Sequence, residues 1–413
     1  MERRRSLPLL LTFISVLTSW SVRAQNYNIS ASGAEGILIK KDASMRRLIQ
    51  TTSSEYYLVA GGWTATGDSV NVFDELWGRP TLEGGVMLGD FHRIRLHDAT
   101  REPVRDVGYM SGLGTMITPY IAFRRPLLRS RRFEVGYKFE NGVGISTRPY
   151  DMETNAENEL IGSKVSVFFG LGVYGAWNVT KNLQVGIDAG FRHYSNGKLD
   201  QPNIGINTVD VGLRATYRIE PDTVVRRVYN VGIDKGWKRH LYADINVGWN
   251  PQTLLSDWIY DYMQEPADRR RHYKSYNAWT LSGALMWRYC RKYASGIGLD
   301  YTYMPFMDDV EASEDRLQKK VDYKLSPHVL GISLHHETFY KNMSLYVSLG
   351  YFLQKRLGAT FDANQKRYYE TFGLRWYMPF LQKRGYISYH INACAIKANS
   401  LQFNVGFCPW KHD

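Results

Sequence analysis

A histidine, a serine and an asparagine lie at the ends of two consecutive strand-like segments near the middle of the sequence. In residues 183–191, apolar residues alternate with polar or small ones, which is the pattern of a strand with one apolar face. Continuing that count places His193 and Ser195 on the apolar face, and the same count through residues 207–217 places Asn207 on the apolar side of the next segment. Serine, histidine and an orienting group are the residue types that acyl transfer needs.

The spacing of these residues suggests a role for each. Residues two apart on a strand share a face and lie about 6.6–7 Å apart, so an imidazole can span the gap to a serine hydroxyl. We expect Ser195 to be the nucleophile, His193 the base that takes its proton, and Asn207 a cross-strand or diagonal neighbour that holds the imidazole through its side-chain oxygen. The Asn196 amide or the Gly197 backbone N–H would then stabilise the oxyanion.

A structural interpretation of the same residues also stands. The His-x-Ser pattern is common, and Tyr, Asn and Gly near a strand end are ordinary loop residues. If the apolar face of these strands faces lipid, burying three polar groups there costs free energy unless they pair with one another or carry a function. At this point, a catalytic site and ordinary polar residues at the ends of strands are both possible interpretations.

The first 24 of the 413 residues resemble a secretory signal peptide. Three arginines precede an apolar run over residues 7–20, and residues 22–24 form a small-x-small cleavage site. The run is too short to span a bilayer, which takes about 20 apolar residues. The three cysteines have no metal-binding spacing, and we expect them to be small apolar residues in strands.

Charge and aromatic content point to a membrane surface. The net charge is +12, of which the signal contributes +3 through four Arg and one Glu, and no nucleic-acid motif accompanies it. The aromatic content is 14%, with 29 Tyr against 17 Phe. Tyr and Trp favour the border between lipid and water, so the composition fits a membrane barrel better than a soluble core.

Alternating segments of about ten residues run along most of the chain and predict about fourteen strands of one antiparallel transmembrane β-barrel. Short turns alternate with long polar loops, as in outer-membrane barrels, where turns are periplasmic and loops external. Two connections break this rule: a short external one near 397 and a long inner one at 219–238. A soluble sandwich is the alternative, but it does not explain the loop asymmetry. The expected strands are 83–92, 116–124, 133–146, 161–177, 183–195, 207–218, 239–250, 275–289, 295–305, 326–338, 343–355, 367–377, 385–396 and 399–408.

The expected domain organisation follows from these segments. It comprises a signal peptide at 1–24, a periplasmic or edge segment at 25–82 and a barrel at 83–413. Within the barrel, residues 83–218 carry the candidate site and residues 239–408 add further strands.

One part of the sequence resembles a known family. The signature of the outer-membrane lipid A deacylases (PagL-type, or acyloxyacyl hydrolases) is similar to a run of residues in this chain. The run is His193-Tyr194-Ser195-Asn196, followed by Gln201-Pro202-Asn203 and Gly205-Ile206. The segment 144–163 resembles the larger members of that family, and the similarity is strongest over residues 83–218. The resemblance implies a β-barrel with a Ser-His-acid triad on the outer surface of its wall.

The resemblance also implies specific roles, with one departure. His193 matches the family base, Ser195 the nucleophile and Asn196 the residue proposed for the oxyanion hole. Asn207 stands where the deacylases have Glu; an amide orients an imidazole but does not stabilise an imidazolium by charge. Asp210 should point into the lumen, and Asp200 in the following loop is the other carboxylate near the site.

The sequence thus predicts an outer-membrane esterase that hydrolyses an ester-linked acyl chain of lipid A, without a metal or other cofactor. The alternative is a non-catalytic barrel of the same ancestry, acting as a structural protein or small-solute pore. The expected partners are lipid A or lipopolysaccharide in the outer leaflet, the membrane itself and a second copy of the chain in a homodimer, with no nucleic acid. In the loop at 251–274, Arg269, Arg270 and Arg271 are candidate contacts for lipid A phosphates, with a solvated charged face as the alternative.

Overall fold

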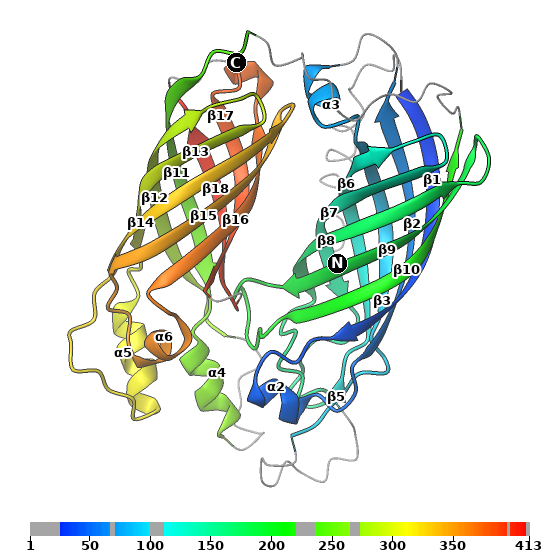
Figure 1. The fold of residues 1–413 in the computed structure, drawn as a ribbon. Helices are drawn as coiled ribbons and strands as arrows, with labels where there is room; N and C mark the ends of the chain where they lie inside the picture. Colours follow the sequence, from blue (N-terminus) through cyan, green and yellow to red (C-terminus); the bar gives the residue numbers. More distant parts are fainter. Residues whose placement is uncertain are drawn as a thin grey trace, which may run out of the picture.

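Two closed barrels of eight antiparallel strands each make up most of the protein (Figure 1). The computed structural model describes residues 25–66, 71–98, 111–219, 236–264, 273–394 and 397–409. The signal peptide expected at 1–24 and the arginines at 269–271 lie outside these ranges. The strands of the first barrel are β1 (Gln25–Leu38), β2 (Ser53–Ala65), β3 (Thr81–Asp90), β6 (Thr115–Arg129), β7 (Phe133–Ser146), β8 (Val165–Asn178), β9 (Leu183–Ser195) and β10 (Ile206–Arg218).

The second barrel begins after the long connection at 219–238. Its strands are β11 (His240–Gln252), β12 (Tyr276–Arg288), β13 (Tyr293–Tyr303), β14 (His328–Tyr340), β15 (Met343–Gln354), β16 (Tyr368–Tyr377), β17 (Gly385–Cys394) and β18 (Lys397–Phe407).

The all-β antiparallel barrel class is confirmed, whereas the single barrel of about fourteen strands is wrong. Each of the predicted segments coincides with a strand, but β1 and β2 complete the first barrel and the chain closes twice. β1 pairs with both β2 and β10, so residues 25–82 contribute barrel wall rather than a periplasmic or edge segment. Alternation shows which face of a strand is apolar, but it does not show which strand closes the barrel.

The short elements gather at the two ends of the barrels (Figure 1). At the end where the long loops lie are α2 (Ala43–Leu48), α4 (Leu255–Tyr262), α5 (Met307–Arg316), α6 (Ala359–Asn364) and the two-residue strands β4 (Arg95–Leu96) and β5 (Ser111–Gly112). The opposite end carries α3 (Val72–Leu76) and a 3-10 turn (Pro379–Leu381). Among the described residues, none of the helices has the length and apolar character needed to cross a membrane.

The two faces of the walls differ sharply in polarity. In β12, Leu281, Leu285 and Trp287 are about half exposed on the outside, while Thr280 and Ser282 are buried inside. Period-two alternation produces this separation, and the outward band matches the lipid-facing surface of a membrane barrel.

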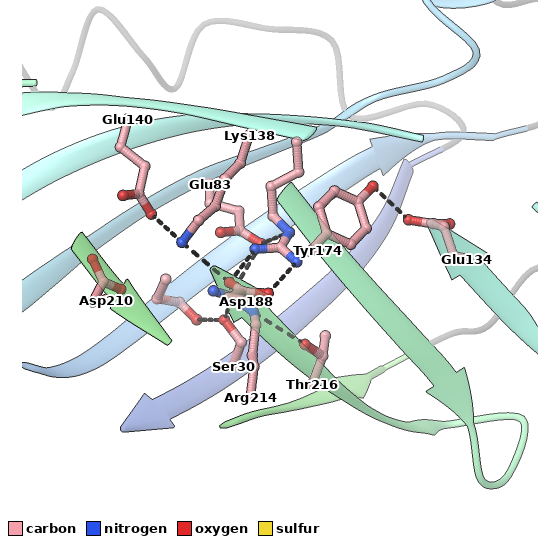
Figure 2. Close-up of polar contacts among 12 residues, drawn as sticks. Ser30, Glu83, Glu134, Lys138, Glu140, Tyr174, Asp188, Asp210, Arg214 and Thr216 are labelled. Atoms are coloured by element: carbon pink, nitrogen blue, oxygen red, sulfur yellow. Dashed lines mark hydrogen bonds and ion pairs between the residues drawn. The ribbon is translucent and has the colours of Figure 1, made fainter. Parts of the chain in front are cut away.

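Buried ion pairs cross the lumen of the first barrel (Figure 2). Arg124 donates to Asp188 at 2.9 Å, and Lys138 lies 2.9 Å from Glu140 and 3.1 Å from Asp188. Charges this deeply buried are tolerated because each has a partner of opposite sign.

The second barrel holds a similar network. The fully buried Arg375 lies 2.7 Å from Asp244 and 3.4 Å from Glu337, and Tyr377 donates to Glu337 at 2.6 Å. Both lumens therefore contain side chains that lock the strands together.

Candidate active site on the outer wall of the first barrel

His193 and Asn207 meet across the β9–β10 hairpin. They are direct register partners, and both point to the outside of the barrel, as the alternation predicts. The Nδ1 atom of His193 lies 2.8 Å from Oδ1 of Asn207. Since an amide oxygen only accepts hydrogen bonds, Nδ1 carries the proton and Nε2 is left as an acceptor. This is the tautomer that a general base needs.

Ser195 ends β9 two residues after the histidine, where two donors reach its hydroxyl. Asn203 Nδ2 donates to Ser195 Oγ at 2.9 Å, and the Gly197 N–H donates to the same oxygen at 3.2 Å. Ser195 is buried, and no hydrogen bond joins it to the His193 ring among the described residues. Catalytic hydrogen bonds of this kind often form only when substrate binds.

The two candidate oxyanion donors have different surroundings. The Asn196 side-chain amide donates to Ser163 Oγ at 3.0 Å and to the Asp200 carbonyl at 3.1 Å, so its donors are already engaged. The Gly197 N–H, in contrast, points at the serine oxygen. The geometry thus favours Gly197 over the Asn196 amide as the donor beside Ser195.

Neither nearby carboxylate reaches the imidazole. Asp210 accepts from Arg192 at 2.7 Å inside the lumen, as its parity predicts. The Asp200 carboxylate accepts the Gln201 N–H at 2.9 Å. Asn207 is therefore the residue that contacts the imidazole across the hairpin, and its buried Nδ2 atom has no hydrogen-bond partner among the described residues.

Some residues near the site had no role assigned from sequence. Asn203 was part of the motif, but only the folded loop brings its amide to Ser195. Lys41 interacts electrostatically with His193, although about 150 residues of sequence separate them and no local pattern connects the two. Gly205 lies so close that a Cβ there would be 3.2 Å from Cε1 of His193, and its φ is +82°. Among the described residues, no group of His, Cys, Asp or Glu is arranged to hold a metal ion.

Lys198 follows the candidate oxyanion donor and lies in the β9–β10 loop. Its Nζ lies 5.4 Å from the ring centre of Phe361, which belongs to α6 beyond the second barrel's β15. Burial, reinforced by the nearby Lys355 ammonium and opposed by Cys394, lowers the pKa of Lys198 to about 8. The loop is thus held in a poorly hydrated place between the two barrels.

This pKa shift predicts a pH-dependent stability. The unfolded chain keeps the Lys198 proton up to its ordinary pKa of 10.5, whereas the folded protein releases it near pH 8. The free energy of unfolding should therefore rise between about pH 8 and 10.5, because the unfolded state binds more protons in that window. We expect Lys198→Met to remove this rise and to stabilise the protein at pH 7, as measured by urea unfolding in detergent at pH 7, 8, 9 and 10. The exposed Lys320→Met is the control, and an unchanged pH profile in Lys198→Met would contradict the assignment.

Comparisons with known proteins identify the class and then the family. The model of the lipid A 3-O-deacylase family matches residues 104–216, and that of the acyloxyacyl hydrolase C-terminal domain matches residues 237–411. Together they cover more than half of the chain. The protein is an outer-membrane β-barrel of the class of enzymes that modify lipid A. It belongs to the lipid A deacylase (acyloxyacyl hydrolase) family. The resemblance noted from sequence is confirmed, and the second family model extends it from residues 83–218 to residues 237–411.

Solved structures are more distant. The crystal structure of the outer membrane enzyme PagL has 16% sequence identity and a TM-score of 0.25, over 45% of this chain and 97% of that chain. The NanC porin has 7% identity and a TM-score of 0.15, over 92% of this chain and all of that chain. No curated protein matches the chain.

Proposed function

We propose that the protein hydrolyses an ester-linked acyl chain of lipid A in the outer membrane, with Ser195 as nucleophile and His193 as base. The observation that carries this proposal is the 2.8 Å contact between His193 Nδ1 and Asn207 Oδ1, two residues along the strand from a serine that receives two hydrogen bonds. Family membership supplies the ester hydrolase class and the lipid A substrate.

The proposed reaction runs in two steps. Ser195 Oγ attacks the acyl carbonyl carbon while His193 Nε2 takes the hydroxyl proton, and the Gly197 N–H stabilises the oxyanion. The ester C–O bond then breaks, and His193 returns the proton to the sugar oxygen of lipid A. His193 then takes a proton from a water molecule that attacks the acyl-enzyme. As the acyl–Oγ bond breaks, His193 returns that proton to Ser195 Oγ and the fatty acid leaves.

Neither lumen favours the alternative role as a small-solute pore. The ion pairs around Asp188 and Arg375 occupy the interiors of the two barrels. Opening either lumen would expose buried charges whose partners lie across the barrel.

Purified protein in detergent tests the proposal directly. Incubated with lipid A, it should release free fatty acid, detected by gas chromatography, together with a lipid A product lighter by one acyl chain. Absence of fatty acid release under conditions where the protein keeps its heat-modifiable gel mobility would reject the proposed activity.

A further inference from the structure

The two strands that close the second barrel do not pair with each other at the end where the candidate site lies. Strands β11 and β18 pair over Ile245–Trp249 and Phe403–Phe407 only. β11 continues to Gln252 and β18 begins at Lys397, so within the described residues their outer ends have no register with each other.

The loop after the candidate nucleophile lies between these two unpaired ends. The Leu401 N–H of β18 donates to the Gly197 carbonyl at 3.1 Å. Thr253, the residue directly after β11, donates to the Lys198 carbonyl twice, through its N–H at 2.9 Å and its hydroxyl at 3.1 Å. Two consecutive carbonyls of the first barrel are thus bound by β18 and by the residue that follows β11, where these two strands do not pair with each other.

The fit at this contact is close. A Cβ on Gly197 would lie 2.6 Å from Leu401 Cβ, and Gly197 has a φ of +61° that favours glycine. Leu401 is 4% exposed, whereas Phe403 and Val405, which share its outward face farther along β18, are 45% and 63% exposed. The first barrel therefore covers the outer face of β18 at Leu401.

The barrels also touch beside the histidine. Phe169 of β8 is the register partner of His193, and its ring centre lies 4.7 Å from that of Phe372 in β16. Phe139 of β7 packs on the same ring at 5.8 Å. The outer wall that carries the candidate site is therefore not exposed to lipid along its whole width, contrary to the expectation from sequence.

We propose that the second barrel is part of the catalytic apparatus, and that Leu401 and Thr253 are positioning residues for the oxyanion donor. By fixing the Gly197 and Lys198 carbonyls, they hold the loop in the conformation that directs the Gly197 N–H toward Ser195 Oγ. A fixed donor stabilises developing charge because it needs no reorganisation during the reaction. The inference rests on the proposed esterase function and assigns a task to the C-terminal half of the chain.

Substitutions at Leu401 separate the hydrogen bond from the packing. Leu401→Pro removes the N–H that bonds to Gly197, and proline is tolerated at strand positions whose N–H lies outside the ladder. Leu401→Ala shortens the side chain but keeps the N–H. We expect kcat for fatty acid release to fall by about tenfold or more in the Pro variant and by less than about threefold in the Ala variant, with KM unchanged in both.

Thr253 provides a second, milder variant in case the proline disturbs folding. Thr253→Val removes the hydroxyl bond to Lys198 and keeps the N–H bond, while Thr253→Ser restores the hydroxyl. We expect Thr253→Val to lower kcat and Thr253→Ser to keep it close to the wild-type value. Thr302→Val is the matched control, since Thr302 lies in β13, away from the loop, and its hydroxyl bonds to Thr280 within the second barrel.

Hydrogen exchange of peptides covering residues 195–205 supplies a readout that does not depend on turnover. Faster exchange in Leu401→Pro and Thr253→Val, but not in Thr302→Val, supports the inference even if the wild-type protein cleaves no ester. That second outcome would reject only the proposed function. Unchanged exchange and unchanged kcat in both variants, measured on protein with normal heat-modifiable mobility, would overturn the inference.

Discussion

Ser195→Ala and His193→Ala should each abolish fatty acid release, lowering kcat by at least about 10³-fold. The serine supplies the atom that forms the acyl-enzyme, and the histidine is the proton carrier in both steps of the proposed reaction. The effect is measured as free fatty acid released from lipid A by protein in detergent micelles.

A matched serine controls for damage to the barrel. Ser166 lies beside Val167, the register partner of Ser195, but it is buried on the lumen side, and within the described part of the chain its hydroxyl has no hydrogen-bond partner. Ser166→Ala should keep full activity and normal heat-modifiable mobility. If Ser195→Ala and His193→Ala both still release fatty acid, the site has been assigned wrongly.

The Asn207 series should show the second large effect. In a serine protease, Asn in place of the triad Asp lowers turnover by about 10⁴-fold, mainly because the imidazole adopts the wrong tautomer. Here Asn207 Oδ1 accepts from Nδ1, so the tautomer is already correct and only the charge is missing. We therefore expect low but real native activity, and a kcat for Asn207→Asp about 10- to 100-fold higher, because a carboxylate stabilises the imidazolium.

Asp is the sharper change because it matches Asn in size and replaces the unpartnered Nδ2 by a second acceptor. Asn207→Glu should also raise kcat if the site has the geometry of the lipid A deacylases. Asn207→Ala should lower kcat by less than Ser195→Ala does, because the Ser-His pair survives. If Asp and Ala are tolerated while Glu abolishes activity, Asn207 is not the third group, and Asp200 becomes the next candidate.

Most strands of this fold could be predicted, because apolar and polar residues alternate along them. The sequence does not show which strands pair to close each barrel, so the closure could not be predicted. β1 was missed since Gly33 and Glu35 interrupt the outward apolar face formed by Tyr27, Ile29, Ala31 and Ile37. The connection at 219–238 broke the loop rule because it joins the two barrels. A barrel of eight strands returns the chain to the side where it started, so this long connection falls on the side of the short turns. Which strand pairs with β1 depends on contacts between residues up to 190 positions apart, such as Asn28 with Arg218.

The candidate site was predictable to the extent that it is local in sequence. His193, Ser195 and Asn207 could be placed on one face because the strand period is fixed at two residues, and the register of His193 with Asn207 agrees with that placement. Leu401 and Thr253 could not be found in this way, because they reach the loop only through the packing of one barrel on the other. The roles of Arg269, Arg270 and Arg271 stay predictions, since these residues lie outside the described ranges.

Mass spectrometry of lipid A from cells with and without this protein tests the central claim most directly. Cells that produce the wild-type protein should contain lipid A lighter by one ester-linked acyl chain, and cells that produce Ser195→Ala should contain the full-length form. Identical lipid A from wild-type-producing and protein-free cells, with the protein present in the outer membrane, would contradict the account.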